Sequence, residues 1–253
     1  MAIVIFIIWG VYVWPQLQST LLRRVTVVFL AVLVIFIHIL AAKTGILSLY
    51  IFFLGYGTYL LFTRKRLVGL ILVLAIPLSV MVASRFIPTF RERVNYVFYS
   101  YVMLKQGDKS GNYGDIARLM SYKLAARIIS EHPVTGVGTG DMKREMDKKY
   151  QEMYPDVPEY GRLLPHNQAL IVGLGCGIPA MLVFLVWVFM PLVSLRRDRQ
   201  SFFFFIVWLI LFIQLMIEPV LEVQFGVFVY AFFLLMQWHE ITGKKTEQEP
   251  SGI

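Results

Sequence analysis

The chain has 253 residues, of which 58% are hydrophobic and only 16% are charged, against about 25% charged residues in ordinary soluble domains. A soluble protein of this length could not bury so much apolar surface, so the composition excludes a soluble globular domain and indicates a lipid environment. The net charge of +8 does not indicate nucleic-acid binding, because the basic residues flank apolar runs and form no continuous basic face.

Seven apolar segments are long enough, or nearly long enough, to cross a bilayer as helices. A spanning helix needs about 20 mostly apolar residues, and in lipid the backbone polar groups must be satisfied within the segment. The predicted spans are Ala2–Leu17, Val25–Ala42, Thr44–Phe62, Leu67–Ser84, Asn167–Ser194, Ser201–Ile217 and Val220–Trp238. The sequence therefore predicts an all-α, polytopic helical membrane protein with about seven spans. Four lie in residues 1–84 and three in 167–240, with a long polar segment at 85–166 and a disordered tail at 241–253.

Basic residues cluster on alternate connections between the predicted spans, and this pattern predicts the orientation of the chain. The clusters are Arg23-Arg24, Arg64–Arg66, Arg196–Arg199 and Lys244-Lys245. By the positive-inside rule they lie in the cytoplasm, so Lys43, residues 85–166 and the Glu218-Pro219 turn lie on the outer face. The same rule places the N-terminus outside, which indicates that further spans precede it.

The polar segment at 85–166 is too long for a bare connection and carries helical patterns of its own. Residues Tyr113–Ser130 have apolar side chains at helical spacing with basic residues between them, which predicts an amphipathic helix ending at His132. Asp141–Tyr154 predicts a second, strongly charged helix. Between them, Gly136–Gly140 has no preceding strand and the wrong spacing for a nucleotide-binding loop, which favours a tight turn where backbone approaches another element.

Polar side chains that could carry chemistry gather on the predicted outer side of the spans. They are Lys43 between the second and third spans, Arg118 on the amphipathic helix, His166 and Asn167 where the segment re-enters the membrane, and Glu218 and Glu222 around the last outer turn. The two glutamates would be one helical turn apart if Pro219 begins the last span. Each residue also has a structural interpretation, such as a snorkelling lysine, a loop-holding histidine or carboxylates paired with cations. Together they suit a substrate with an anionic head and a lipid tail.

No motif in the sequence predicts a metal or a cofactor. The sequence contains no HExxH motif, no aspartate-x-aspartate pair and no histidine cluster, and Cys176 is its one cysteine. His38 stands alone inside the second predicted span, where we interpret it as a packing residue or a partner in an interhelical hydrogen bond.

Several short motifs after Arg118 together form one known pattern. They are Arg118-x3-Tyr122, the run Glu131–Asp141 (EHPVTGVGTGD), Pro165–Leu170 (PHNQAL) and Gly175-x-Gly177-Ile178. Their order is also characteristic, with a basic residue before Thr44-Gly45, a long outer segment, His-Asn at the start of a span, and a final pair of spans containing Glu218 and Glu222. From about Leu30 to Trp238 the chain resembles the O-antigen ligase/polymerase family of bacterial envelope enzymes.

The resemblance implies an integral-membrane glycosyltransferase of the C type, without metal or cofactor, at the outer face of the bacterial inner membrane. Such enzymes pass a glycan from a polyprenyl diphosphate carrier to lipid A core, a polysaccharide or a protein. By resemblance, Arg118 and Lys43 would hold the diphosphate and His166 would be the base in an inverting transfer, supported by Asn167, Glu218 and Glu222. The family usually has arginine at the position of Lys43 and more spans before it. The chain is therefore similar to the C-terminal part of a longer enzyme or to a shortened member.

Two other classes of function stay open. A transporter or flippase of lipid-linked sugars tends to place polar groups near mid-membrane in broken helices, whereas the predicted spans here are mostly free of charge at their centres. A non-catalytic membrane scaffold would use the outer helices to bind a partner. The sequence also leaves open the sugar, the acceptor and the choice between ligase and polymerase.

Overall fold

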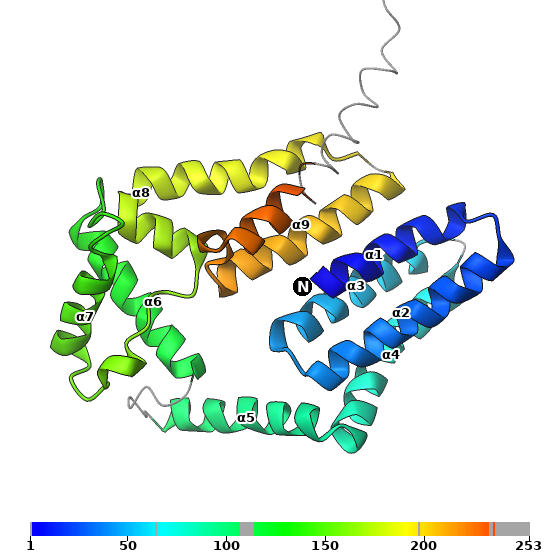
Figure 1. Cartoon of the computed structure of the whole chain (residues 1–253), viewed down its shortest axis with the longest axis horizontal. Helices are drawn as coiled ribbons and strands as arrows, with labels where there is room; N and C mark the ends of the chain where they lie inside the picture. Colours follow the sequence, from blue (N-terminus) through cyan, green and yellow to red (C-terminus); the bar gives the residue numbers. More distant parts are fainter. Residues whose placement is uncertain (1, 64, 107–113, 197, 233–234, 236–253) are drawn as a thin grey trace, which may run out of the picture. The chain divides into compact units, whose positions relative to one another are not determined.

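The computed structural model describes residues 2–63, 65–106, 114–196, 198–232 and 235, and these residues are helical or in turns and loops, without a strand (Figure 1). The α-helices are α1 (Ala2–Val13), α2 (Thr20–Leu40), α3 (Lys43–Leu61), α4 (Arg66–Phe86), α5 (Pro88–Lys105), α6 (Gly114–Glu131), α7 (Met142–Met153), α8 (Gln168–Phe189) and α9 (Arg199–Ile217). Short 3₁₀ turns lie at Trp14–Gln16, Glu159–Gly161, Met190–Ser194 and Val220–Glu222, and residues 224–232 are again helical. The predicted all-α class is confirmed.

Five of the described helices are long and apolar enough to cross a membrane. They are Thr20–Leu40, Lys43–Leu61, Arg66–Phe86, Gln168–Ser194 and Arg199–Ile217, and they match five of the seven predicted spans. The first predicted span corresponds to the shorter apolar helix Ala2–Gln16. The end of the seventh and the tail at 241–253 lie outside the described residues. The polytopic helical character is therefore confirmed, while the number of spans and their orientation stay predictions.

The chain divides into two compact units: unit 1 comprises Met1–Phe98 and Asp198–Ile210, and unit 2 comprises Tyr99–Arg197 and Leu211–Ile253. In unit 1, α3 packs closely along α4. The helices approach at Gly57 and Gly69, where a Cβ on Gly69 would lie 2.6 Å from the Gly57 carbonyl oxygen, so this approach requires glycine.

The polar side chain of His38 is satisfied within unit 1. The imidazole of His38 on α2 lies 2.7 Å through Nδ1 from the Val34 carbonyl and 3.0 Å through Nε2 from the Tyr50 hydroxyl of α3. This contact confirms the expected interhelical hydrogen bond of His38. It satisfies a polar group inside a spanning segment, where no water is present to do so.

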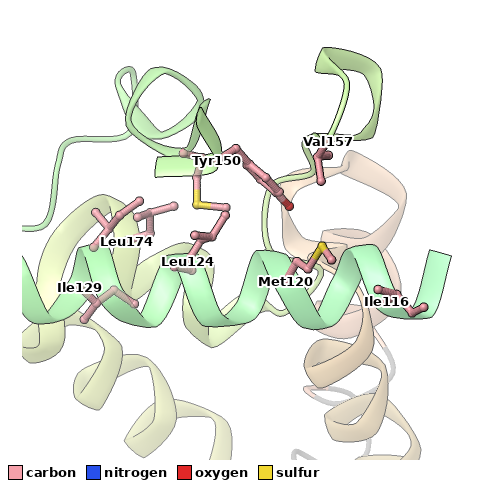
Figure 2. Close-up of a cluster of buried hydrophobic side chains, with 10 residues drawn as sticks. Ile116, Met120, Leu124, Ile129, Tyr150, Val157 and Leu174 are labelled. Carbon is pink, nitrogen blue, oxygen red and sulfur yellow. The ribbon is translucent and has the colours of Figure 1, made fainter. Parts of the chain in front are cut away.

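The core of unit 2 is built on α6, which confirms the predicted amphipathic helix. Its buried residues recur every four positions at Ile116, Met120, Leu124 and Ile128, one stripe of a helix surface. They pack with Met146 and Tyr150 of α7, with Val157 and with Leu174 of α8 (Figure 2). The charged helix expected at Asp141–Tyr154 is confirmed as α7. The helix α5 was not predicted, because Arg91–Arg93 interrupts its apolar pattern.

The span α8 is interrupted at Gly177, whose backbone has φ 83° and ψ 177°. Three backbone hydrogen bonds join this region to the loop after α6: Val137 N–H donates to Leu174 O at 2.9 Å, Gly138 N–H to Gly175 O at 3.0 Å, and Ile178 N–H to Pro133 O at 2.7 Å. The glycine-rich loop is therefore the tight turn that the sequence predicts. It compensates for helical hydrogen bonds lost at the break and fixes α8 to the loop that follows α6.

Candidate active site

Two helices and one turn of unit 2 place the site residues. Arg118 and Tyr122 lie one helical turn apart on α6, on a helix anchored by the core described above. His166, Asn167 and Gln168 form the entry to α8, and Glu218 and Glu222 follow α9. Every residue in this group belongs to unit 2.

The Glu218 carboxylate contacts two other side chains of the group, those of Arg118 and His166. One carboxylate oxygen, Oε1, forms an ion pair with the Arg118 guanidinium. The other, Oε2, lies 2.7 Å from Nδ1 of His166. All three side chains are about 30% exposed, so the cluster is partly shielded but open to a ligand. The structure thus brings together three residues that the sequence could place only on the same predicted face.

The entry to α8 is held by a set of side-chain hydrogen bonds. Asn167 caps the helix, because its Oδ1 accepts from Leu170 N–H at 3.0 Å. Its Nδ2 donates to the Met216 carbonyl at 3.1 Å, which ties the start of α8 to the end of α9. The Tyr122 hydroxyl donates to the His166 carbonyl at 2.5 Å. The His166 carbonyl is therefore held by Tyr122 and its imidazole by Glu218, directly before the Asn167 cap.

Glu222 is placed differently from Glu218. Its carboxylate accepts from Nε2 of buried Gln168 at 2.9 Å, and the Gln168 Oε1 accepts from Leu221 N–H at 2.9 Å. The condition under which the two glutamates would lie one helical turn apart, that Pro219 begins the last span, is not met, since α9 ends at Ile217 and a 3₁₀ turn follows at Val220–Glu222. Glu218 precedes that turn and Glu222 is its last residue, so the two glutamates do not lie one turn apart on a single α-helix. The Gln168 amide accepts a hydrogen bond from the backbone of the turn.

Lys43 lies in unit 1, where it begins α3. Its ammonium lies 5.1 Å from the centroid of the Tyr96 ring, a cation–π contact. Its expected role as a second cation on a diphosphate stays a prediction.

Two residues of the site were missed by reasoning from the sequence. Tyr122 and Gln168 both lie in the quoted motifs, but neither side chain has a distinctive charge or spacing that signals a role. Burial raises the pKa of Tyr122, with the Arg118 charge opposing and the Glu218 charge adding to that shift. The phenol therefore stays protonated and remains a donor to the His166 carbonyl.

The arrangement can support acid–base chemistry beside an anion-binding group. A carboxylate on Nδ1 selects the tautomer in which this nitrogen carries the proton, leaving the lone pair on Nε2 as an acceptor. The guanidinium next to it carries five N–H donors suited to phosphate oxygens. Among the described residues, no three His, Cys, Asp or Glu side chains are grouped closely enough to hold a metal ion.

The fold and this cluster define a class: a helical, multi-pass membrane protein with an arginine–glutamate–histidine centre beside a spanning helix. Residues 28–185, more than half of the chain, match the O-antigen ligase family. The chain belongs to that family. A comparison with curated proteins gave no match. Membership supports a general role in ligating or polymerising glycans in bacterial surface polysaccharide biosynthesis.

Proposed function

We propose that this protein transfers a glycan from a polyprenyl diphosphate carrier to an acceptor hydroxyl, at the outer face of the bacterial inner membrane. One observation carries the proposal: a single carboxylate, that of Glu218, contacts both the Arg118 guanidinium and Nδ1 of His166. This contact joins a candidate phosphate-binding group and a candidate base in one unit. Both are needed when an alcohol displaces a diphosphate.

His166 is the proposed general base. With Nδ1–H donating to Glu218, the Nε2 lone pair takes the proton of the acceptor hydroxyl. The acceptor oxygen forms its bond to the anomeric carbon while the bond from that carbon to the diphosphate oxygen breaks. The electron pair leaves on the diphosphate. Attack opposite to the leaving group inverts the configuration in one displacement, without a glycosyl-enzyme.

Arg118 is the proposed diphosphate ligand. A diphosphate becomes a good leaving group once its developing charge is neutralised, and a guanidinium in a partly shielded site does this electrostatically. Glu218 holds one side of the guanidinium, which leaves its other N–H groups for phosphate oxygens. We propose Lys43 as the second cation, and the acceptor as lipid A core, a polysaccharide or a protein.

The test is transfer in proteoliposomes supplied with a lipid-linked glycan and an acceptor. We expect His166→Ala to lower turnover by about 10²–10⁴-fold, the usual contribution of a general base, with donor binding largely kept. His132→Ala is the matched control, because His132 is an exposed histidine of the same segment beyond the end of α6. His166→Gln keeps hydrogen bonding but not proton uptake at neutral pH. Near-normal turnover in that variant would remove His166 as the base.

A flippase of lipid-linked sugars is the alternative that one observation favours, since transporters use broken helices and α8 is broken at Gly177. Here, however, backbone groups at the break bond the loop at 133–138 and have no need of a ligand. Vesicles loaded with labelled carrier separate the two functions. Movement of the carrier across the bilayer without glycan transfer would support the flippase.

A further inference from the structure

A pocket of about 370 Å³ lies between α2 and α4 in unit 1. Its lining residues are Val34, Ile35 and His38 of α2, Ser79, Val82, Ala83 and Phe86 of α4, and Ile87, which follows α4. Both helices are long and apolar enough to span the membrane. The pocket therefore lies between two candidate spans, a position that a ligand would reach from the bilayer.

The polar groups in the pocket wall are already satisfied, so the pocket presents hydrocarbon. The His38 imidazole donates from Nδ1 to the Val34 carbonyl and accepts at Nε2 from the Tyr50 hydroxyl. The Ser79 hydroxyl donates to the Ile76 carbonyl at 2.8 Å. With its polar atoms paired within the protein, this wall offers no unmet hydrogen bond to a polar ligand and suits an apolar chain.

The pocket lies at the end of the bundle where cations begin. Ala41, which follows α2, packs with Ala83 and Phe90, and the Thr89 hydroxyl donates to the Ile39 carbonyl at 2.9 Å. These contacts fix the end of α2, the end of α4 and the start of α5 together.

Two basic residues stand at this end. Lys43 follows Ala41 by two positions, and exposed Arg85 lies between the lining residues Ala83 and Phe86. An apolar pocket with two cations at one end fits an amphiphile that has a hydrocarbon chain and an anionic head.

We propose that this pocket binds the part of the polyprenyl chain next to the diphosphate of the glycan donor, with Lys43 and Arg85 toward the head. The assignment rests on the proposed function and adds a site for the lipid part of the same substrate. Charge complementarity favours this lipid over a bulk phospholipid. A diphosphate carries more negative charge than the single phosphodiester of an ordinary headgroup, and so matches two cations better.

The experiment narrows the pocket and varies the chain of the donor. Val82→Trp places an indole in the pocket, and Met81→Trp is the control at the same depth, because Met81 is exposed on α4 but does not line the pocket. For a long-chain donor we expect Val82→Trp to raise KM about tenfold, comparable to losing the burial of about two methylene groups, with kcat unchanged. A donor with a methyl group in place of the polyprenyl chain has no hydrocarbon to enter the pocket, so it should show equal KM in wild type and in the Val82→Trp protein.

Three results would overturn the proposal: an unchanged KM for the long-chain donor, an equal rise in Met81→Trp, or an equal rise for the methyl donor. If Val82→Trp does not fold, a protein with a photoreactive benzophenone residue in place of Val82 provides a second test. Irradiated with radiolabelled polyprenyl diphosphate in phosphatidylglycerol vesicles, this protein should crosslink the polyprenyl chain, and the equivalent at Met81 should not. Crosslinking to phospholipid alone would refute the polyprenyl site. Crosslinking of the polyprenyl chain by the benzophenone protein, together with no glycan transfer by wild type, would count against the proposed function only.

Discussion

The helices α2 and α6 have similar lengths but bury very different shares of their side chains. α2 buries only Ile37 and His38 and leaves large apolar side chains such as Val28 and Ile35 exposed. α6 buries eight residues in a compact core and turns charged side chains outward. The exposed apolar side chains of α2 indicate that lipid is its solvent. The burial of apolar side chains on α6 follows the ordinary hydrophobic effect in water. Polar contacts therefore position the site in unit 2, while unit 1 offers surfaces for hydrocarbon.

The largest effect we expect comes from the carboxylate that joins the site. Glu218→Gln keeps the shape but removes the charge that pairs Arg118 and orients His166, so turnover should fall by about 10²–10⁴-fold. Glu222→Gln is the matched control, because Glu222 touches Gln168 and not the reactive pair. Both are measured as initial rates of transfer at saturating donor. Equal rates in the two variants would mean that Glu218 has only a structural role.

The next effect tests how strictly backbone contacts hold the loop after α6 to α8. A Cβ on Gly177 would lie 2.2 Å from the Val134 carbonyl oxygen at a φ of +83°, so Gly177→Ala should cost more than about 3 kcal/mol of unfolding free energy. Gly138 has φ +85° but open space, and Gly138→Ala should cost about 1–2 kcal/mol through strain alone. Gly140→Ala meets open space and should be nearly neutral. Denaturant unfolding in detergent ranks them, and equal stabilities would contradict the contacts.

The smallest effect concerns the exposed ion pair between α6 and α7. Hydrogen bonds from Lys149 and Arg127 hold the pKa of Glu131 below its usual 4.5. A carboxylate whose pKa is lowered by folding stabilises the fold above its unfolded pKa, and that contribution is lost as pH falls through the folded value. Wild type should therefore be slightly more stable than Glu131→Gln at pH 7. The difference should vanish in acid below the folded pKa, and thermal unfolding at both pH values measures it.

Hydropathy and helical spacing were sufficient to predict α6, α7 and five spanning helices, because each has a long periodic or continuous apolar pattern. Side-chain chemistry and the family motifs singled out His166, Arg118 and Glu218. They could not predict that Glu218 touches both of the others, since that contact depends on how α9 ends. The turn after α9 is so tight that a Cβ on Gly226 would lie 1.7 Å from the Val220 carbonyl oxygen. The contacts of Glu218 join residues 52 and 100 positions apart in the chain, and no local propensity encodes them.

The position of Glu218 in the chain also determines at which point of protein synthesis the arginine–glutamate–histidine centre can form. It follows His166 by 52 residues and Arg118 by 100, with α8 and α9 between. Chains emerge from the ribosome with the N-terminal parts first, so the arginine and the histidine are synthesised before their shared partner. A nascent chain halted before this turn has the histidine but not the group that selects its tautomer. The centre can therefore form only after α9 has been synthesised, and under the proposed function a chain that stops before Glu218 should transfer no glycan.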